Sequence, residues 1–132
     1  GMAFSNAGLG MDHAIAHSLG GVLDVMHGMV HPVLLPAVMR YNYPASPDKM
    51  ARLGGIICLK PFGDVEEAAL SGIQQLESFF QEFPIPNRLR DIMSDSSRLP
   101  QVCQMAVQDA CLLTNPREAS SQDCLRLCEE AW

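Results

Sequence analysis

The chain has 132 residues, of which 48% are hydrophobic and 18% charged, and its formal net charge is −6. This length and balance exclude a disordered chain and favour one domain with a single core over residues 1–132, with Gly1 a tag remnant ahead of Met2. The scattered basic residues exclude nucleic acid as a partner, and no apolar run reaches the roughly 20 residues that cross a bilayer, so we expect no membrane partner.

The first predicted helix runs from about Gly10 to Leu23, because its apolar residues recur at spacings of three and four. A second helix is expected to begin near His27 or Pro32 and to break at the Tyr41–Pro44 segment. The five cysteines contain no CxxC pair, which favours reduced thiols and a cytoplasmic location.

A third helix is predicted from Ser46, a capping residue followed by proline, to about Leu53. We expect Gly54 and Gly55 to stop this helix. The apolar segment 56–59 fits either a strand or a buried helix, since four residues alone do not separate the two.

The second half of the chain shows the clearest amphipathic pattern, which Asp64 opens and which ends near Phe83. Three further helices are predicted, at residues 87–93, 99–113 and 121–131, the last capped by Ser120 or Ser121. Together these segments predict an all-α, bundle-like domain of about six or seven helices.

All four histidines lie between residues 13 and 31. His13 and His17 are four residues apart on one predicted helix, so both rings project from the same face, and His27 follows after a turn. Imidazole is a common ligand for zinc and suits iron(II), so two or three of these rings can hold a divalent ion. Asp12 points about 100° away from His13 and is a poor co-ligand. Hydrogen bonding of the histidines without a metal is the other interpretation of this spacing.

Several sequence blocks resemble the iron-containing (group III) alcohol dehydrogenases. They begin with AFSNAGLG at residues 3–10, followed by His13-x3-His17-x2-Gly20-Gly21 and His27-Gly28. They continue with LLP at 34–36, MRYN at 39–42, DAC at 109–111 and TNPR at 114–117, and the chain closes with Ala131-Trp132. The matching blocks run from end to end in the same order.

The resemblance implies the C-terminal helical domain of a fold similar to that of dehydroquinate synthase. In that family one aspartate and three histidines hold iron(II) or zinc, and His13 and His27 match the two ligands from the helical domain. The other two ligands and the turns that bind NAD or NADP belong to an N-terminal nucleotide-binding domain, which we expect to be absent here. The family oxidises or reduces a small alcohol or aldehyde by hydride transfer.

The resemblance also implies roles for residues beside the metal. His17 matches a histidine that does not ligate the metal, and we expect it to be catalytic by moving a proton or positioning substrate. Phe4, Leu9 and Cys111 match positions that line the substrate pocket, although core packing is an equal interpretation for each. His31 matches no family role and is interpreted as structural.

Without a nucleotide-binding half, the chain is expected to be inactive by itself. Its expected partners are a separate nucleotide-binding domain or a second copy of the chain in a homodimer. Two other functions remain open from the sequence. One is a truncated, non-catalytic helical interaction or dimerisation module, and the other is a domain similar to that of zinc polyol dehydrogenases.

Overall fold

The computed structural model describes residues 1–132, and it consists of helices joined by short connections, without a strand. The prediction of an all-α domain is therefore confirmed. None of the helices is both long and apolar enough to cross a membrane. In chain order the α-helices are α1 (Met2–Ala7), α2 (Met11–Leu23), α3 (His27–Asn42), α4 (Pro47–Ile57), α5 (Val65–Gln81), α6 (Leu99–Ala106) and α7 (Ser121–Glu130). Three 3-10 helices accompany them: η1 (Tyr43–Ala45), η2 (Leu89–Asp91) and η3 (Ala110–Thr114).

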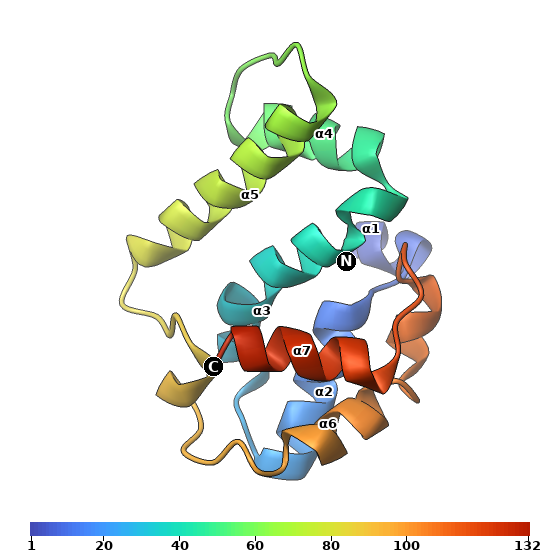
Figure 1. Ribbon diagram of the computed structural model, residues 1–132, viewed down its shortest axis with the longest axis vertical. Coiled ribbons are helices and arrows are strands. Elements are labelled where there is room, and N and C mark those ends of the chain that lie inside the picture. The colour runs from blue at the N-terminus through green and yellow to red at the C-terminus, as the bar shows by residue number, and fades with distance from the viewer.

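Helix α2 lies at the centre of the core and packs against α3 and α6, while α7 packs against α6 and α3 (Figure 1). Its apolar stripe includes Met11, Ile15 and Leu19, which are all fully buried. Burying each of these large side chains contributes about 1.5–3 kcal/mol relative to exposing it. The core cluster joins this stripe to buried residues of α3, α6 and α7, and it fixes how α2 and α3 face each other.

Helix α3 begins at His27 and continues through Asn42, so it passes two internal prolines, Pro32 and Pro36. Each proline lacks the N–H that would bond to the carbonyl four residues earlier, which weakens the local helix. Burial compensates for that loss, because Val30, Leu34 and other apolar residues of this helix pack into the core.

The expectation that Gly54 and Gly55 stop the third helix is wrong, because α4 continues to Ile57. Gly54 instead lies where α4 meets α5, and the two helices form a hairpin that projects from the rest of the fold (Figure 1). A Cβ at Gly54 would lie 1.8 Å from the Ala68 carbonyl oxygen, and one at Gly72 would lie 2.4 Å from the Gly54 Cα. Close contact between the two backbones therefore explains the glycines. This result also assigns residues 56–57 to a helix and not to a strand.

Two further boundaries differ from the predictions. The helix expected over 99–113 ends at Ala106, and η3 follows after a break. At the break Asp109 has an extended backbone, and its carboxylate accepts a hydrogen bond from the Cys111 N–H, which replaces helical bonding. The segment 87–93 forms only the short η2, and α1 was not predicted at all.

Of the two serines expected to cap the last helix, Ser120 is the cap, and Asp64, expected only to open its segment, caps α5. The Asp64 carboxylate accepts a hydrogen bond from the Glu67 N–H, and the Ser120 hydroxyl accepts one from the Asp123 N–H. Asp123 in turn accepts bonds from the backbone N–H and hydroxyl of Ser120, which completes a capping box at the start of α7. The bonds from Ser120, helped by Arg126, lower the pKa of Asp123 to about 2.

The Gly54 contact predicts a difference between two neighbouring substitutions. Gly54→Ala should lower the free energy of unfolding by about 1–3 kcal/mol, because its methyl group would collide with the α5 backbone. Gly55→Ala should be neutral or stabilise by up to about 1 kcal/mol, since a Cβ there lies 3.5 Å from its nearest neighbour and alanine favours a helix. Urea unfolding monitored by circular dichroism measures both, and equal stabilities of the two variants would contradict the packing.

The capping box predicts a pH dependence of stability. The folded pKa of Asp123, about 2, lies below the value of about 3.9 for an unfolded aspartate. Its contribution is therefore fully present above about pH 4 and is lost as the pH falls towards 2. Asp123→Asn should be less stable than the unaltered chain at pH 7, and the gap should shrink across this acidic range. A gap that stays constant in thermal unfolding from pH 7 to pH 2 would contradict the role of the charge.

Candidate metal centre

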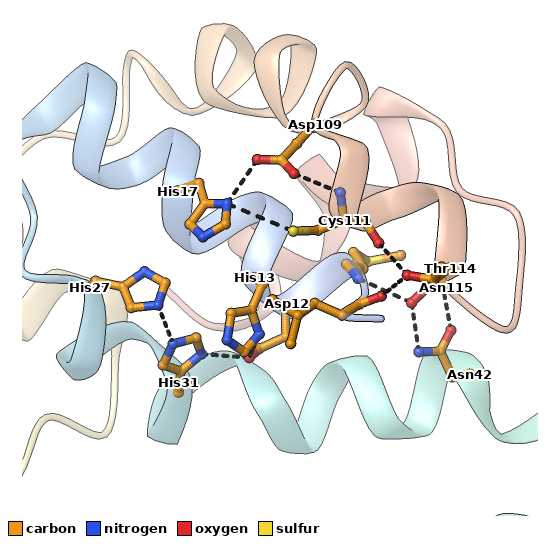
Figure 2. A network of polar contacts seen from close by, with 12 residues as sticks. Asp12, His13, His17, His27, His31, Asn42, Asp109, Cys111, Thr114 and Asn115 are labelled. Carbon is orange, nitrogen blue, oxygen red and sulfur yellow. Dashed lines mark hydrogen bonds and ion pairs between the residues drawn. The ribbon is translucent and has the colours of Figure 1, made fainter. Parts of the chain in front are cut away.

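The four histidine rings converge on one space between α2 and α3 (Figure 2). His13 and His17 project from α2, and His27 and His31 project from the first two turns of α3. The ring centroids of His13 and His27 lie 5.5 Å apart, and those of His17 and His27 lie 5.2 Å apart. Each helix thus contributes two rings at a spacing of four residues, and the packing of the helices brings the pairs together.

His31 lies inside this group, although the sequence suggested only a structural role for it. Its ring centroid is 4.5 Å from that of His13 and 4.5 Å from that of His27. Its Nε2 atom lies 3.0 Å from the Nε2 atom of His27. His31 follows His27 by four residues, so the two rings lie on the same face of the helix. That spacing is the signal in the sequence that could have placed His31 in the histidine group.

Asp12 also approaches the group, despite the angle that separates it from His13 on α2. One of its carboxylate oxygens lies 2.5 Å from His31 Nδ1 and 3.7 Å from His13 Nδ1. The expectation that Asp12 points away from His13 held for a single helix, but α3 brings His31 to the other side of the carboxylate. The side chain of Asp12 is only 9% exposed, and its second oxygen is buried without a hydrogen-bond partner.

The electrostatic environment favours the neutral form of two of the rings. Partial burial, followed by the neighbouring His31 and other imidazoles, lowers the pKa of both His13 and His27. A neutral imidazole has a free lone pair, which is the form that ligates a metal. The hydrogen bond to Asp12 raises the pKa of His31.

A second group of polar residues adjoins the first and is built around His17. Its Nδ1 atom lies 2.8 Å from Asp109 Oδ2 and 3.9 Å from the Cys111 sulfur. Burial raises the pKa of Asp109, but hydrogen bonds from the Cys111 N–H and His17 outweigh it and lower that pKa overall. Burial, then the adjacent Asp109, raises the pKa of the Cys111 thiol. Asp109, which had no role assigned from the sequence beyond its place in the DAC block, therefore orients His17.

The predicted pocket residues occupy different places. Leu9 lies with His13 and His31 along a groove that runs between the start of α2 and α3. Phe4 is on α1 with about half of its surface exposed and is not part of this groove. Cys111 faces His17 instead. The structure thus brings Leu9 to the histidines and leaves Phe4 farther out.

Asn115 braces the helices that carry the histidines. Its side-chain oxygen accepts hydrogen bonds from the Met11 N–H, at 3.1 Å, and from the Asn42 amide, at 3.0 Å. Its amide donates to the Asn42 oxygen and to the Arg117 carbonyl. One side chain therefore ties the first residue of α2 to the last residue of α3 (Figure 2).

The start of α2 is also held by close packing. Gly8 has a φ of 75° and a Cβ there would lie within 2.7 Å of three Thr114 side-chain atoms, so a side chain is excluded on both grounds. The Thr114 hydroxyl donates to the Leu9 carbonyl. Gly8 and Thr114, which belong to separate blocks of the sequence, are thus in contact in the fold.

The donor set fits a divalent ion. Nitrogen atoms of His13, His27 and His31 all lie within 4.8 Å of one another. Three imidazoles in their neutral form suit an ion of borderline softness such as zinc or iron(II). The buried, partly unpartnered carboxylate of Asp12 adds negative charge beside them, which favours a cation at this position.

Comparison with known proteins assigns the family. The family model described as "Fe-containing alcohol dehydrogenase family, C-terminal" matches residues 1–132. Lactaldehyde reductase of Escherichia coli K12 is 36% identical over 133 residues, and 1,3-propanediol dehydrogenase of Klebsiella pneumoniae is 37% identical over 136 residues. The chain belongs to the Fe-containing alcohol dehydrogenase family and corresponds to its C-terminal domain, which confirms the resemblance seen in the sequence.

The fold agrees with this assignment. The crystal structure of a 1,3-propanediol oxidoreductase superposes on the chain with a TM-score of 0.94 and 36% identity, covering 100% of this chain and 35% of that one. The two relatives are likewise covered over only 35% and 34% of their lengths, while the whole of this chain is aligned. The chain thus spans about a third of these relatives.

The Asn115 brace predicts a loss of stability. Asn115→Ala should lower the free energy of unfolding by about 1–3 kcal/mol, because it removes the acceptor for the Met11 N–H and leaves the buried Asn42 without its partner. Asn87→Ala is a suitable control, since Asn87 is exposed and its side chain makes no hydrogen bond. Thermal unfolding compares the two, and equal losses would contradict the bracing role.

Proposed function

We propose that this chain is the metal-binding half of an NAD- or NADP-dependent alcohol dehydrogenase. In this proposal His13 and His27 supply two ligands to an iron(II) or zinc ion. The observation that carries it is the convergence of these two rings, 5.5 Å apart, from different helices of a domain that belongs to this family. Their lowered pKa values favour the neutral form that binds a metal.

The proposed substrate is a small alcohol or aldehyde. When bound, a divalent ion at this site supplies the Lewis acidity that lowers the pKa of an alcohol. The chain's own contribution is to orient the ion's ligands and to move a proton. The groove that contains Leu9 lies beside His13 and gives a small apolar substrate a surface to pack against.

His17 is the proposed catalytic residue for proton movement. An ionised carboxylate only accepts hydrogen bonds, so the contact with Asp109 places the proton of His17 on Nδ1. The Nε2 atom then carries the lone pair and can take a proton from substrate or water. Asp109 acts as a positioning residue, because it fixes the tautomer and the orientation of the ring.

The proposed partner is a nucleotide-binding domain that carries NAD or NADP and the remaining metal ligands. The all-helical chain has no strand-to-helix turn of the kind that holds a pyrophosphate. Apolar side chains that remain exposed, including Phe4 and Leu113, are available for such a contact or for a homodimer. The five cysteines are all free thiols, which supports a cytoplasmic location.

This proposal predicts that the chain alone does not turn over substrate. Purified chain supplied with iron(II), NAD or NADP, and short alcohols or diols should show no sustained formation of NADH or NADPH. The physical reason is that the chain offers no site to hold the nicotinamide beside the metal. Addition of a nucleotide-binding half should restore activity, and absorbance at the nicotinamide band follows both reactions. Sustained turnover by the chain alone would contradict the proposed division of roles.

The ligand assignment has its own test. His13→Ala and His27→Ala should each reduce the iron or zinc retained by the chain after desalting by at least about tenfold, because each removes a ligand. Met26→Ala changes the exposed neighbour of His27 and should retain metal like the unaltered chain. Elemental analysis gives the metal content, and full retention by both histidine variants would instead favour a non-catalytic helical module.

A further inference from the structure

His31 and His27 approach each other in a way that suits a shared cation. Their Nε2 atoms lie 3.0 Å apart, and nitrogen atoms of His13, His27 and His31 all lie within 4.8 Å. Zinc–nitrogen bonds are about 2.0–2.1 Å long, so two imidazoles on one tetrahedral ion have nitrogen atoms about 3.3 Å apart. The observed spacing is therefore close to that of two ligands of one ion.

Asp12 prepares His31 for this role. A carboxylate accepts but does not donate, so the 2.5 Å contact places the ring proton of His31 on Nδ1 and leaves the lone pair on Nε2. That lone pair is directed towards His27 (Figure 2). Histidines that ligate metals commonly donate their other ring N–H to a carboxylate in this manner, which fixes the tautomer and raises the ligand's basicity.

A second, independent observation concerns the charge of Asp12. Its side chain is more than nine-tenths buried, and its other oxygen has no hydrogen-bond partner. No lysine or arginine forms an ion pair with it, and its only ionisable contacts are the rings of His13 and His31. Burying a carboxylate without a permanently charged partner is costly, and a cation held by these rings would offset its charge.

We propose that His31 is a third protein ligand, oriented by Asp12, and that His13, His27 and His31 together hold a divalent cation of borderline softness on this chain alone. This inference rests on the proposed role of His13 and His27 and extends it. Three nitrogen ligands leave the remaining coordination positions of the ion open for ligands from the nucleotide-binding domain and for water or substrate.

The neighbouring group around His17 fits a cation less well. Both Asp109 oxygens are already used, one by His17 and the other by the Cys111 N–H. The raised pKa of the Cys111 thiol opposes the thiolate form that would bind a metal. Hydrogen bonding thus accounts for the His17 group without an ion, whereas it leaves one buried oxygen of Asp12 without a partner.

The test is titration of the purified 132-residue chain with cobalt(II), whose visible absorption reports the number and geometry of its ligands. His31→Asn and His31→Gln should each weaken binding by at least about tenfold and change the spectrum, since neither amide replaces an imidazole nitrogen. The asparagine amide nitrogen takes the place of Nδ1 and can still donate to Asp12, and the glutamine variant keeps the proposal testable if the asparagine variant does not fold. Circular dichroism checks that each variant is helical.

Two aspartate substitutions separate the orientation of His31 by Asp12 from the effect of the chain's overall negative charge on cation binding. Asp12→Asn should weaken cobalt(II) binding by about 10–100-fold, because the amide no longer fixes the His31 tautomer. Asp24→Asn removes the same charge from an exposed position and should bind like the unaltered chain. In addition, zinc(II) should shift the ¹⁵N resonance of His31 Nε2, a change that a purely structural histidine would not show.

The outcomes distinguish this inference from the proposed function. If both His31 variants bind cobalt(II) like the unaltered chain while His13→Ala and His27→Ala do not, His31 is no ligand and the proposed function stands. If His13→Ala and His27→Ala also leave binding unchanged, both proposals fail. If His17→Ala alone abolishes binding, the ion belongs to the His17 group and the inference is overturned.

Discussion

The packing of α2 against α3 is the constraint on which the site depends. Neither helix alone can surround an ion, because residues four apart on one helix supply only two rings on one face. The fully buried stripe of α2, including Ile15 and Leu19, fixes the distance and crossing of the two helices. The histidines lie along the edge of this contact, so the same hydrophobic burial that stabilises the core also sets the separation of the rings.

The polar contacts at the start of α2 and the end of α3 serve the same geometry. Asn115 bonds to the start of α2 and to the end of α3, and Thr114 packs against Gly8 in the segment that leads into α2. These contacts limit sliding of α2 along α3, which would separate His13 from His31. The α4–α5 hairpin, by contrast, makes its tightest contacts within itself, through Gly54 and Gly72.

Two carboxylates, Asp12 and Asp109, give the four histidines different surroundings. Asp12 bonds to His31 and faces the group that also contains His13 and His27, whereas Asp109 bonds to His17. Each carboxylate holds the proton of its partner on Nδ1 and so leaves Nε2 as the reactive nitrogen. In the proposed function, this difference separates the histidines that ligate the metal from the one that moves a proton.

The sequence by itself determined the helical class, the start of α5 at Asp64, a serine cap for α7 and, through its ordered blocks, the family. Those features depend on short-range periodicity or on a linear pattern, which one chain displays directly. The tertiary structure alone decided that Gly54 continues a helix and that His31, Asp12 and Asp109 join the histidine site. A helical wheel gives the direction of a side chain only relative to its own axis, so Asp12 pointed away from His13. Which atoms meet across two helices depends on their crossing, and that is set by the packing of the whole core.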